Sequence, residues 1–349
     1  MSKFRVALSG DFFKPDGTPT YPMFDMKRLT SDSRIEVGTV KDVGGAMHGD
    51  ALADYDALIL LMPKFNAASM APGGRLGLVA RFGVGYDTVD VAACSAGDVA
   101  LCITPDGVRR PVAVSILTFI FALAGKLMIK DKLTRQGPEG FNKRSEHMGV
   151  GLVGKTLASI GIGNIGAELF RLAAPFGFKF IAHDPYADEA IAAQLGIELV
   201  PLERIFREAD FLSISAPLTP ETRHIVNAER LALMKPTSFL INTSRGPTVD
   251  QKALTIALRE RRIAGAGLDV FDVEPVPADE PLLGFDNVVL APHALCWTDE
   301  CFAGNGAADV AAVLDFMHGR EPRAIVNRAV ASHAGWLRKL QTNRRNFGD

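Results

Sequence analysis

The chain has 349 residues, which predicts about two domains of ordinary size. Its composition, 48% hydrophobic and 22% charged, is that of an ordinary globular protein. The net charge of −2 gives no electrostatic reason to expect nucleic acid or an anionic membrane as the main partner.

The first residues form a strand pattern without the features of a signal peptide, so we expect a cytoplasmic location. The longest apolar stretch, Val112 to Ala124, is shorter than the roughly 20 residues that span a membrane. It predicts a buried core helix that starts at Pro111. None of the cysteines has the spacing of a metal site, and we expect neither a metal nor a disulfide.

Five β-rich runs separated by loops and helical patterns predict a first parallel α/β domain over residues 1–108. These runs are Arg5–Gly10, Ile35–Val40, Ala57–Leu61, Leu78–Phe82 and Val99–Ile103. Gly83 and Gly85 come shortly after the fourth run. Such a turn either points backbone amides at an anion such as a carboxylate or merely leaves the strand. A break at Thr104–Gly107 then ends the domain.

Six further strands separated by helices predict a second, doubly wound domain over residues 109–297. The strands are Leu157–Gly161, Phe178–Asp184, Phe211–Pro217, Ser238–Ser244, Gly265–Val270 and Val288–His293. Residues 298–330 are expected to return to the first domain through a helix and a short extended segment, Ala324–Asn327. Residues 331–349 form a basic tail that we expect either to be loose or to pack on a partner subunit.

The most informative motif is Gly161-Ile162-Gly163-Asn164-Ile165-Gly166, between a strand and a helical segment. In a dinucleotide-binding turn the first glycine makes the tight turn, the second lets a pyrophosphate approach the backbone, and the third lets helix and strand pack closely. Unpaired amides at the helix start then hold the phosphates. The sequence therefore predicts a Rossmann NAD-binding domain inserted into a flavodoxin-like substrate domain.

Asp184 stands at the end of the strand that follows this helix. A carboxylate there accepts hydrogen bonds from the adenosine ribose and repels a 2′-phosphate. No lysine or arginine follows it closely, so the sequence favours NAD over NADP.

Three residues that follow strand ends suit acid–base chemistry on a carbonyl, namely Arg245, Glu274 and His293. Arg245 offers a planar fork of donors, and Gly246 beside it is expected to leave room for substrate. Glu274 is expected to orient His293, which then exchanges a proton with the substrate oxygen. Each residue alone has an ordinary structural explanation. The prediction depends on their joint occurrence beside the dinucleotide motif.

These motifs together resemble the D-isomer-specific 2-hydroxyacid dehydrogenases. The resemblance extends to about residue 330 and is carried by the glycine turn with Asp184, Ala216–Thr222, Asn242–Gly246, Leu268–Pro275 and Pro292-His293. It implies a homodimeric, NAD-dependent oxidoreductase. The reaction it implies is hydride transfer between NAD(H) and a small D-2-hydroxy or 2-keto acid, bound in a cleft between the two domains.

The motifs and the resemblance also imply the site residues. The catalytic residues are Arg245, Glu274 and His293. The cofactor contacts are Gly161, Gly163, Asn164, Ile165, Gly166, Asp184, Ala216, Pro217, Thr243, Asp269 and Val84. The substrate contacts are Phe82, Gly83, Val84, Gly85, Arg245 and His293.

The chain departs from the family pattern at the first crossing between domains, where Ile103–Arg110 replaces the family's Asn-Thr-Pro-Gly. The wall that faces the substrate is therefore expected to differ, and Arg109 or Arg110 is either solvated or in contact with an acidic substrate. Trp297 either lines the site, as in glyoxylate and hydroxypyruvate reductases, or only packs. Formate is not expected, because formate dehydrogenases have a glutamine where Glu274 stands. Too little sequence follows residue 330 for the regulatory domain of many phosphoglycerate dehydrogenases.

A second hypothesis is an NAD-sensing binding protein like the dehydrogenase-related transcriptional corepressors. Those proteins keep the same three residues, so the residues alone do not separate the two hypotheses. A corepressor needs a peptide groove or disordered tails, and the sequence shows little disorder. A screen of 2-keto acids with NADH and NADPH distinguishes them.

Overall fold

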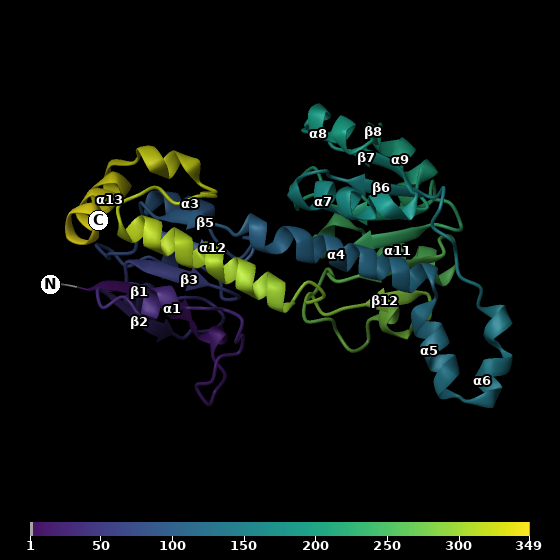
Figure 1. Cartoon of the computed structure of the whole chain (residues 1–349), viewed down its shortest axis with the longest axis horizontal. Helices are drawn as coiled ribbons and strands as arrows, with labels where there is room; N and C mark the ends of the chain where they lie inside the picture. The colour runs from purple at the N-terminus through teal and green to yellow at the C-terminus, as the bar shows by residue number, and fades with distance from the viewer. Residues whose placement is uncertain (1–2, 349) are drawn as a thin grey trace. The chain divides into compact units, whose positions relative to one another are not determined.

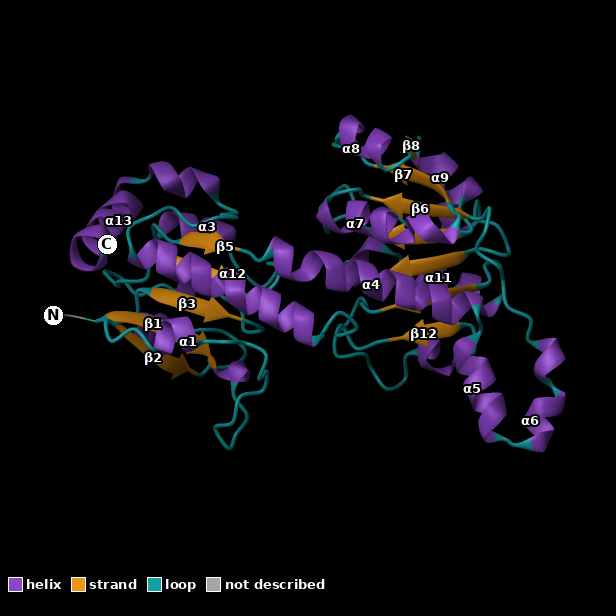
Figure 2. Cartoon of the chain, viewed as in Figure 1, coloured by secondary structure: helices purple, strands orange, loops and turns teal. Residues whose placement is uncertain are grey.

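The computed structural model describes residues 3–348, which form two compact units. Unit 1 comprises Met1–Val108 and Thr298–Asp349, and unit 2 comprises Arg109–Trp297. Each unit is built on its own parallel sheet with helices beside the strands (Figure 1, Figure 2). The predicted fold class, two α/β domains with parallel sheets, is confirmed.

Unit 1 contains a five-stranded sheet in the order β2-β1-β3-β4-β5, the order of flavodoxin-like doubly wound sheets. All five predicted strands are present, with ends that differ by at most one residue. The central strand β3 is buried over its whole length, as expected where helices cover both faces of a parallel sheet. The strands are β1 (Phe4–Ser9), β2 (Ile35–Val40), β3 (Ala57–Leu60), β4 (Leu78–Arg81) and β5 (Ala100–Cys102).

The helices of unit 1 come from both ends of the chain. The N-terminal part supplies α1 (Lys27–Thr30), α2 (Gly49–Leu52) and α3 (Val91–Ala96), and the C-terminal part supplies α12 (Asp299–Met317) and α13 (Ala334–Phe347). Helix α12 packs on β4 and crosses the first sheet in Figure 1. The extended segment predicted at Ala324–Asn327 does return to this unit, because the Val326 amide donates to the Leu101 carbonyl at 2.8 Å.

Unit 2 contains a seven-stranded parallel sheet in the order β12-β11-β10-β9-β6-β7-β8. Six of its strands were predicted, and the seventh, β8 (Ile197–Leu199), was missed. It is a three-residue edge strand with only its first residue buried, and the alternation in Ile-Glu-Leu is too short to indicate a strand. The other strands are β6 (Thr156–Ile160), β7 (Lys179–His183), β9 (Phe211–Ile214), β10 (Phe239–Asn242), β11 (Gly265–Leu268) and β12 (Val288–Leu290).

Neighbouring residues of these strands contribute to two different hydrophobic cores, one on each face of the second sheet. Leu157 belongs to the core with α4 and α7, whereas Ala158 belongs to the core with α9, α10 and α11. Because both faces are covered, the central strands read as continuous apolar runs. The helices of unit 2, with α4 crossing into it from unit 1, are α4 (Pro105–Ala124), α5 (Leu127–Arg135), α6 (Pro138–Asn142), α7 (Asn164–Ala173), α8 (Glu189–Gln194), α9 (Leu202–Glu208), α10 (Ala228–Leu231) and α11 (Gln251–Arg259).

The start of α4 differs from the prediction, because the helix begins at Pro105 and contains Pro111 in its interior. Proline is well suited to the first helical position, so Pro105 starts the helix where a break was expected. Gly107 does not end it either, because it lies against α12. A Cβ at Gly107 would come within 2.2 Å of Asn305 Oδ1, so glycine here permits two helices to touch.

Helix α4 has 20 residues, which by length and composition is enough to cross a membrane. The sequence had predicted a shorter helix that starts at Pro111. Its most apolar window is 61% buried inside the structure. The buried side chains, among them Ile116 and Phe119, pack in the core shared with β6 and α7. The predicted role as a core helix is thus the one that the packing supports.

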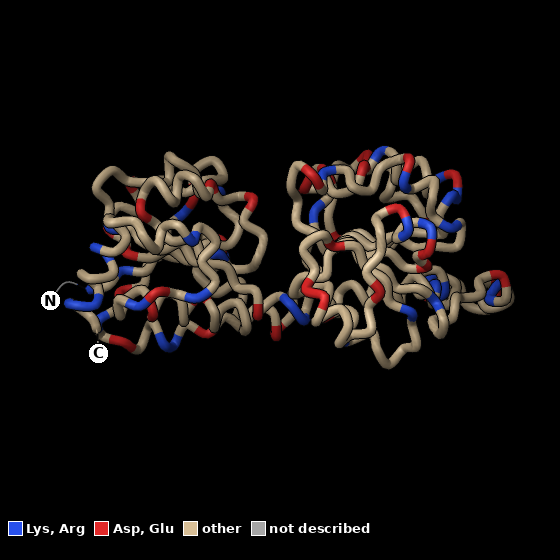
Figure 3. Tube along the Cα trace, turned by 90° about the horizontal axis from the view of Figure 1, so that it is seen from above, with Lys and Arg blue, Asp and Glu red and all other residues tan. Residues whose placement is uncertain are grey.

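Charged residues are interspersed along both units. In the view of Figure 3, segments of both signs alternate along the trace without a one-sided accumulation of lysine and arginine.

The C-terminal tail was predicted to be loose or to pack on a partner subunit. A loose tail is wrong for the described residues, and contact with a partner stays a prediction. Its helix α13 packs inside unit 1, where Trp336 is fully buried and its indole Nε1 donates to the Gly77 carbonyl at 3.0 Å. The apolar spacing in the sequence indicated a helix but not the surface that this helix covers.

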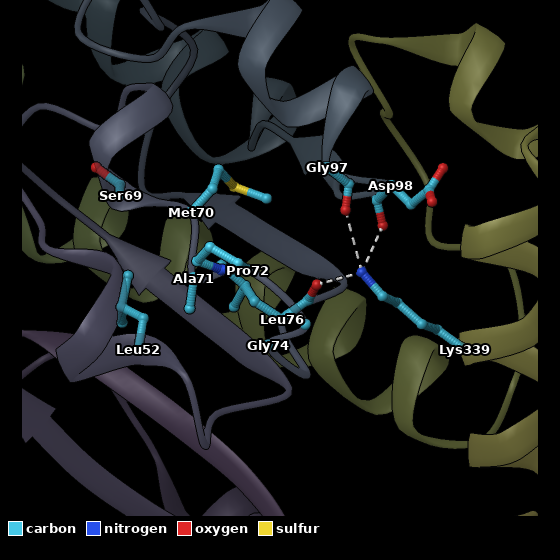
Figure 4. A pocket seen from close by; sticks show the side chains of 11 residues that line it. Leu52, Ser69, Met70, Ala71, Pro72, Gly74, Leu76, Gly97, Asp98 and Lys339 are labelled. Carbon is cyan, nitrogen blue, oxygen red and sulfur yellow. Dashed lines mark hydrogen bonds between the residues drawn. The ribbon is translucent and has the colours of Figure 1, made fainter.

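Lys339 ties α13 to two loops that precede strands of the first sheet. Its ammonium group donates to the carbonyls of Leu76 at 2.6 Å, Asp98 at 3.0 Å and Gly97 at 3.2 Å (Figure 4). These groups border a cavity of about 390 Å³ whose wall also includes Ser69. Burial lowers the pKa of Lys339, and the charge of Asp98 opposes that effect.

We predict that Lys339→Met destabilises the protein by about 2 kcal/mol, because three carbonyls lose a charged donor while the apolar stem is kept. Urea unfolding followed by circular dichroism measures the change. The matched control is Arg338→Met on the exposed side of the same helix, which should alter stability by less than about 0.5 kcal/mol. Equal effects of the two substitutions would contradict the role given to Lys339.

Candidate functional site

The carboxyl ends of the strands in unit 2 collect the motifs found in the sequence. Parallel strands all end at the same edge of a sheet, and ligands of doubly wound sheets bind beyond that edge. The residues that follow the strand ends are Gly161 after β6, Asp184 after β7, Ala216 after β9, Arg245 after β10, Asp269 after β11 and His293 after β12.

The three glycines of the turn after β6 meet different surroundings. Gly161 has φ +92°, and a Cβ there would lie 2.9 Å from the backbone of Ser215 and Ala216. A Cβ at Gly166 would lie 2.4 Å from the Gly161 carbonyl oxygen, whereas one at Gly163 would meet nothing within 4 Å. Gly161 and Gly166 are therefore required by packing, and Gly163 faces open space.

Helix α7 begins directly after Gly163 and carries no side-chain cap. Gly163 and Asn164 are both exposed. The first amides of a helix have no partner within it, and together with the helix dipole they attract an anion. The open space beside Gly163 and these uncapped amides fit the pyrophosphate of a dinucleotide, with backbone donors at Asn164 and Ile165.

Asp184 connects the end of β7 to the glycine turn. Its Oδ2 accepts a hydrogen bond from the Ile162 amide at 2.9 Å, and its Oδ1 accepts one from the Tyr186 amide at 2.8 Å. Each carboxylate oxygen has two lone pairs, so both oxygens can still accept a bond from a ribose hydroxyl. The carboxylate is thus held in place beside the turn.

The Arg110 side chain is 55% exposed, and its contact with a substrate stays a prediction. Its Nε lies 3.8 Å from Oε1 of Glu168, a buried carboxylate on α7 that also pairs with Arg171. All three residues belong to unit 2. This ion pair links α4 to the helix that follows the glycine turn.

A series of close contacts joins the glycine turn to the loop after β10. The backbone of Ser215 and Ala216 lies against Gly161, and the Ser244 hydroxyl donates to the Ala216 carbonyl at 2.9 Å. Arg245 follows directly, with its Nη1 donating to the Ser244 carbonyl at 2.7 Å. The predicted neighbours Ala216 and Arg245 are therefore brought together.

Gly246 has a different role from the one predicted. A Cβ there would lie 2.0 Å from the Phe271 backbone, so the space beside Gly246 is filled by the chain rather than left for substrate. This close approach brings the loop that carries Glu274 against the loop that carries Arg245. The glycine was noticed in the sequence, but its neighbour is 25 residues away and no local pattern indicates the contact.

Glu274 and His293 form a hydrogen-bonded pair. The distance between His293 Nδ1 and Glu274 Oε2 is 2.8 Å, and the other oxygen of Glu274 accepts the Phe271 amide at 2.9 Å. Burial raises the pKa of Glu274, but the bonds from His293 and Phe271 and the charges of His293 and Arg245 leave it below its ordinary value. An ionised carboxylate thus accepts from Nδ1, and the His293 side chain, 46% exposed, leaves Nε2 accessible.

Asp269 fixes the loop that presents His293. Its buried carboxylate accepts the amides of Ala294 at 3.0 Å and Leu295 at 3.2 Å. Burial raises the pKa of Asp269, and these two hydrogen bonds oppose the rise. His293 itself has φ +55°, a left-handed conformation that is uncommon outside glycine and that clusters at functional sites.

The predicted substrate loop, Phe82–Gly85, lies in unit 1 directly after β4. The Phe82 amide donates to the Leu60 carbonyl at 2.9 Å, and the Gly83 amide donates to Thr104 Oγ1 at 2.8 Å. Among residues 3–348, the amides of Val84 and Gly85 have no such partner. They are the donors of this loop that remain for an anion.

Of the other predicted contacts, Ala216 is buried, Pro217 is exposed and Thr243 is partly exposed, all directly after β9 or β10. Trp297 is 43% exposed.

Within residues 3–348, no group of histidine, cysteine or acidic side chains is arranged to hold a metal ion. The four cysteines are free thiols.

Sequence reasoning missed the support beneath the Phe82–Gly85 loop. Thr104 bonds to the Gly83 amide and donates to Asn305 Oδ1 at 2.7 Å. Asn305 stands between two glycines inside a helix, and this unusual Gly-Asn-Gly run was the available signal.

Comparison with known proteins identifies the family. The model of the D-isomer specific 2-hydroxyacid dehydrogenase NAD binding domain matches residues 117–294. A glyoxylate reductase of Korarchaeum cryptofilum is 38% identical over 286 residues, covering 80% of this chain and 85% of the relative. The chain belongs to the D-isomer-specific 2-hydroxyacid dehydrogenase family, and it is an oxidoreductase that uses a nicotinamide dinucleotide.

Other relatives include a longer protein and two solved structures. A D-3-phosphoglycerate dehydrogenase of Synechocystis is 36% identical over 280 residues, 80% of this chain but only 50% of that protein. The structure of an NADPH-dependent glyoxylate/hydroxypyruvate reductase from Sinorhizobium meliloti, in complex with NADP and malonate, matches with TM-score 0.79 and 28% identity over 93% of this chain and 97% of the other. The D-mandelate dehydrogenase of Rhodotorula graminis matches with TM-score 0.80 and 26% identity over 93% and 98%.

We predict opposite consequences for two glycine substitutions in the turn. Gly166→Ala should lower stability by about 1–3 kcal/mol, because the added methyl group meets the Gly161 carbonyl. Gly163→Ala should leave stability nearly unchanged and weaken NADH binding, because its methyl group points into the space expected for the pyrophosphate. Thermal unfolding and NADH fluorescence titration measure the two effects. Unchanged NADH affinity in Gly163→Ala would argue against this binding position.

Proposed function

We propose that this chain catalyses reversible hydride transfer between NAD(H) and C2 of a small D-2-hydroxy or 2-keto acid of the glyoxylate, hydroxypyruvate or glycerate kind. The observation that carries the proposal is the 2.8 Å hydrogen bond between His293 and Glu274 at the sheet edge that also bears the glycine turn. The names of the relatives, glyoxylate reductase and D-3-phosphoglycerate dehydrogenase, support the substrate class.

His293 is the proposed acid–base residue. Because Glu274 accepts the Nδ1 hydrogen, Nε2 of the neutral ring has the free lone pair. In oxidation Nε2 takes the proton of the substrate hydroxyl, and in reduction the doubly protonated ring returns it to the C2 oxygen. The carboxylate of Glu274 balances the positive charge of the ring in that state. When bound, the nicotinamide supplies or accepts the hydride.

Arg245 is the proposed binding group for the substrate carboxylate and the C2 oxygen. Its planar guanidinium can donate to two oxygens at once. The effect of its charge on Glu274 supports a position close to the acid–base pair. The amides of Val84 and Gly85 are proposed as further donors to the carboxylate, while Phe82 and Gly83 act by shaping that loop.

The cofactor contacts are assigned along the same sheet edge. Gly163, Asn164 and Ile165 are proposed to hold the pyrophosphate, and Asp184 the adenosine ribose. Gly161 and Gly166 shape the turn. The nicotinamide half is assigned to Ala216, Pro217, Thr243, Asp269 and Val84. The carboxylate of Asp184 supports NAD rather than NADP, although one similar reductase uses NADPH.

We also propose that the protein is a homodimer. The arm formed by α5 and α6 extends from the second sheet in Figure 1, and α5 has no buried residue. Several large apolar side chains of this arm and the adjoining segment are more than half exposed, namely Leu127, Met128, Phe141 and Met148. Such a surface supports contact with a second copy. A sedimentation mass of a single chain would contradict this assignment.

The substrate proposal predicts that a panel of 2-keto acids supports NADH oxidation, followed by the loss of absorbance of NADH. Glyoxylate and hydroxypyruvate should be among the substrates, and NADPH should be used less well because Asp184 repels its 2′-phosphate. A clear preference for NADPH would contradict the role of Asp184. Absence of turnover across the whole panel would instead favour an NAD-sensing binding protein.

We predict that His293→Ala lowers kcat by about 10²–10⁴-fold, the usual contribution of a general acid–base group. The dissociation constant of NADH should change by less than about twofold, because the dinucleotide contacts lie in other loops. Steady-state kinetics and fluorescence titration give the two values, with His147→Ala as the control outside the site. Parallel loss of turnover and NADH binding would show that His293 has a structural role.

A further inference from the structure

Asp309 is a buried acid outside the chemistry assigned to the candidate site. It lies on α12, it is 1% exposed, and both carboxylate oxygens lack a hydrogen-bond partner within residues 3–348. A buried polar atom without a partner costs free energy, and native proteins keep few of them. An acid retained at this cost points to a function.

Arg81 is the charged residue whose field affects the pKa of Asp309. Burial raises the pKa of Asp309 well above its ordinary value, and the charge of Arg81 works against that rise. Arg81 is the last residue of β4, the strand on which α12 packs. The two residues therefore lie on directly packed elements of unit 1.

The side chain of Arg81 folds over the backbone of the Phe82–Gly85 loop. Its Nη1 donates to the Phe82 carbonyl. A Cβ at Gly83 would come within 2.6 Å of the same nitrogen, so the loop and the guanidinium are in contact. The position of Arg81 thus influences the direction in which the loop leaves β4.

Helix α12 is also linked to the same loop through Asn305, one turn before Asp309, with Thr104 between them. Asn305 accepts the Thr104 hydroxyl at 2.7 Å, and Thr104 Oγ1 accepts the Gly83 amide at 2.8 Å. Residues four apart share one face of a helix, so Asn305 and Asp309 both face β4 and its loop. One face of α12 therefore carries two buried polar groups directed toward this loop.

The ring of Phe82 is fixed independently of these polar contacts. Its centroid lies 5.3 Å from those of Phe12 and Phe24 and 5.4 Å from that of Phe302. With the Phe82 ring, the Phe82 carbonyl and the Gly83 amide all held, the amides of Val84 and Gly85 are the donors left for a ligand.

We propose that Asp309 is a positioning residue for the substrate site: it holds the Arg81 guanidinium, and through it the Phe82–Gly85 loop, in the conformation that presents the Val84 and Gly85 amides to the carboxylate of a 2-keto acid. This inference rests on the proposed function. The acid lowers the stability of the fold, because an apolar residue at position 309 would leave no buried polar group without a partner. In return it fixes the conformation of the loop.

The test is Asp309→Asn, which keeps the shape of the side chain and removes its acidic group. We expect the KM for the 2-keto acid to rise about tenfold while kcat changes less than about twofold, since the loop binds ground and transition states alike. The NADH dissociation constant should not change, and the melting temperature should stay the same or rise. A purely structural role of Asp309 would lower the melting temperature and leave KM unchanged, which would overturn the proposal.

Two further variants isolate the pathway through Arg81. Asp315→Asn changes a half-buried acid of the same helix that pairs with Arg320; it is the matched control and should leave KM unchanged. Arg81→Met should raise KM, and the double variant Asp309→Asn/Arg81→Met should have the KM of Arg81→Met alone, because Asp309 acts through that side chain. Multiplying effects in the double variant, or an unchanged KM in Arg81→Met, would contradict the proposal even if Asp309→Asn does not fold.

Failure of the inference differs from failure of the proposed function. Wild-type protein that reduces no 2-keto acid contradicts the function. In that case calorimetric titration of wild type and variants with malonate in the presence of NAD tests the carboxylate site without turnover. Weaker malonate binding in Asp309→Asn than in Asp315→Asn supports the positioning role, and equal binding overturns it.

Discussion

Contact between backbones at three glycines is the constraint on which the candidate site depends. Gly161 lies against the chain after β9, Gly166 against the turn after β6, and Gly246 against the loop after β11. A methyl group at any of these positions would come closer to a backbone atom than ordinary van der Waals contact allows. The loops at the carboxyl edge of the second sheet can therefore meet only because these side chains are absent.

Carboxylates then hold the loops that the glycines bring together. Asp184 accepts amides of the glycine turn and of its own loop, Asp269 accepts two amides beyond His293, and Glu274 accepts one amide while it orients the imidazole. Backbone donors with a charged acceptor form stronger hydrogen bonds than neutral pairs do. In this way acidic groups that lie beside the proposed chemistry also give it a fixed geometry.

Features encoded locally could be predicted from the sequence. The buried parallel strands appear as apolar runs, and the glycine turn has a fixed spacing, so the sheets and the residues at their ends were found. The sequence did not indicate that α4 runs through Gly107, which residue lies against Gly246, or where α13 packs. Each of these depends on contact with a distant residue, namely Asn305, Phe271 and Gly77. Asp309 was missed for the same reason, although an isolated acid within an apolar helical run is an unusual pattern.

The assembly of unit 1 from both ends of the chain has a consequence for biosynthesis. Its sheet is made by the first part of the chain, but Trp336 and Lys339 close the loops that precede β4 and β5. Unit 2 is one continuous segment, so all its residues are translated before α12 and α13. The core of the dinucleotide domain is therefore complete in the chain before that of the flanking domain, whose apolar strands wait for α12 and α13.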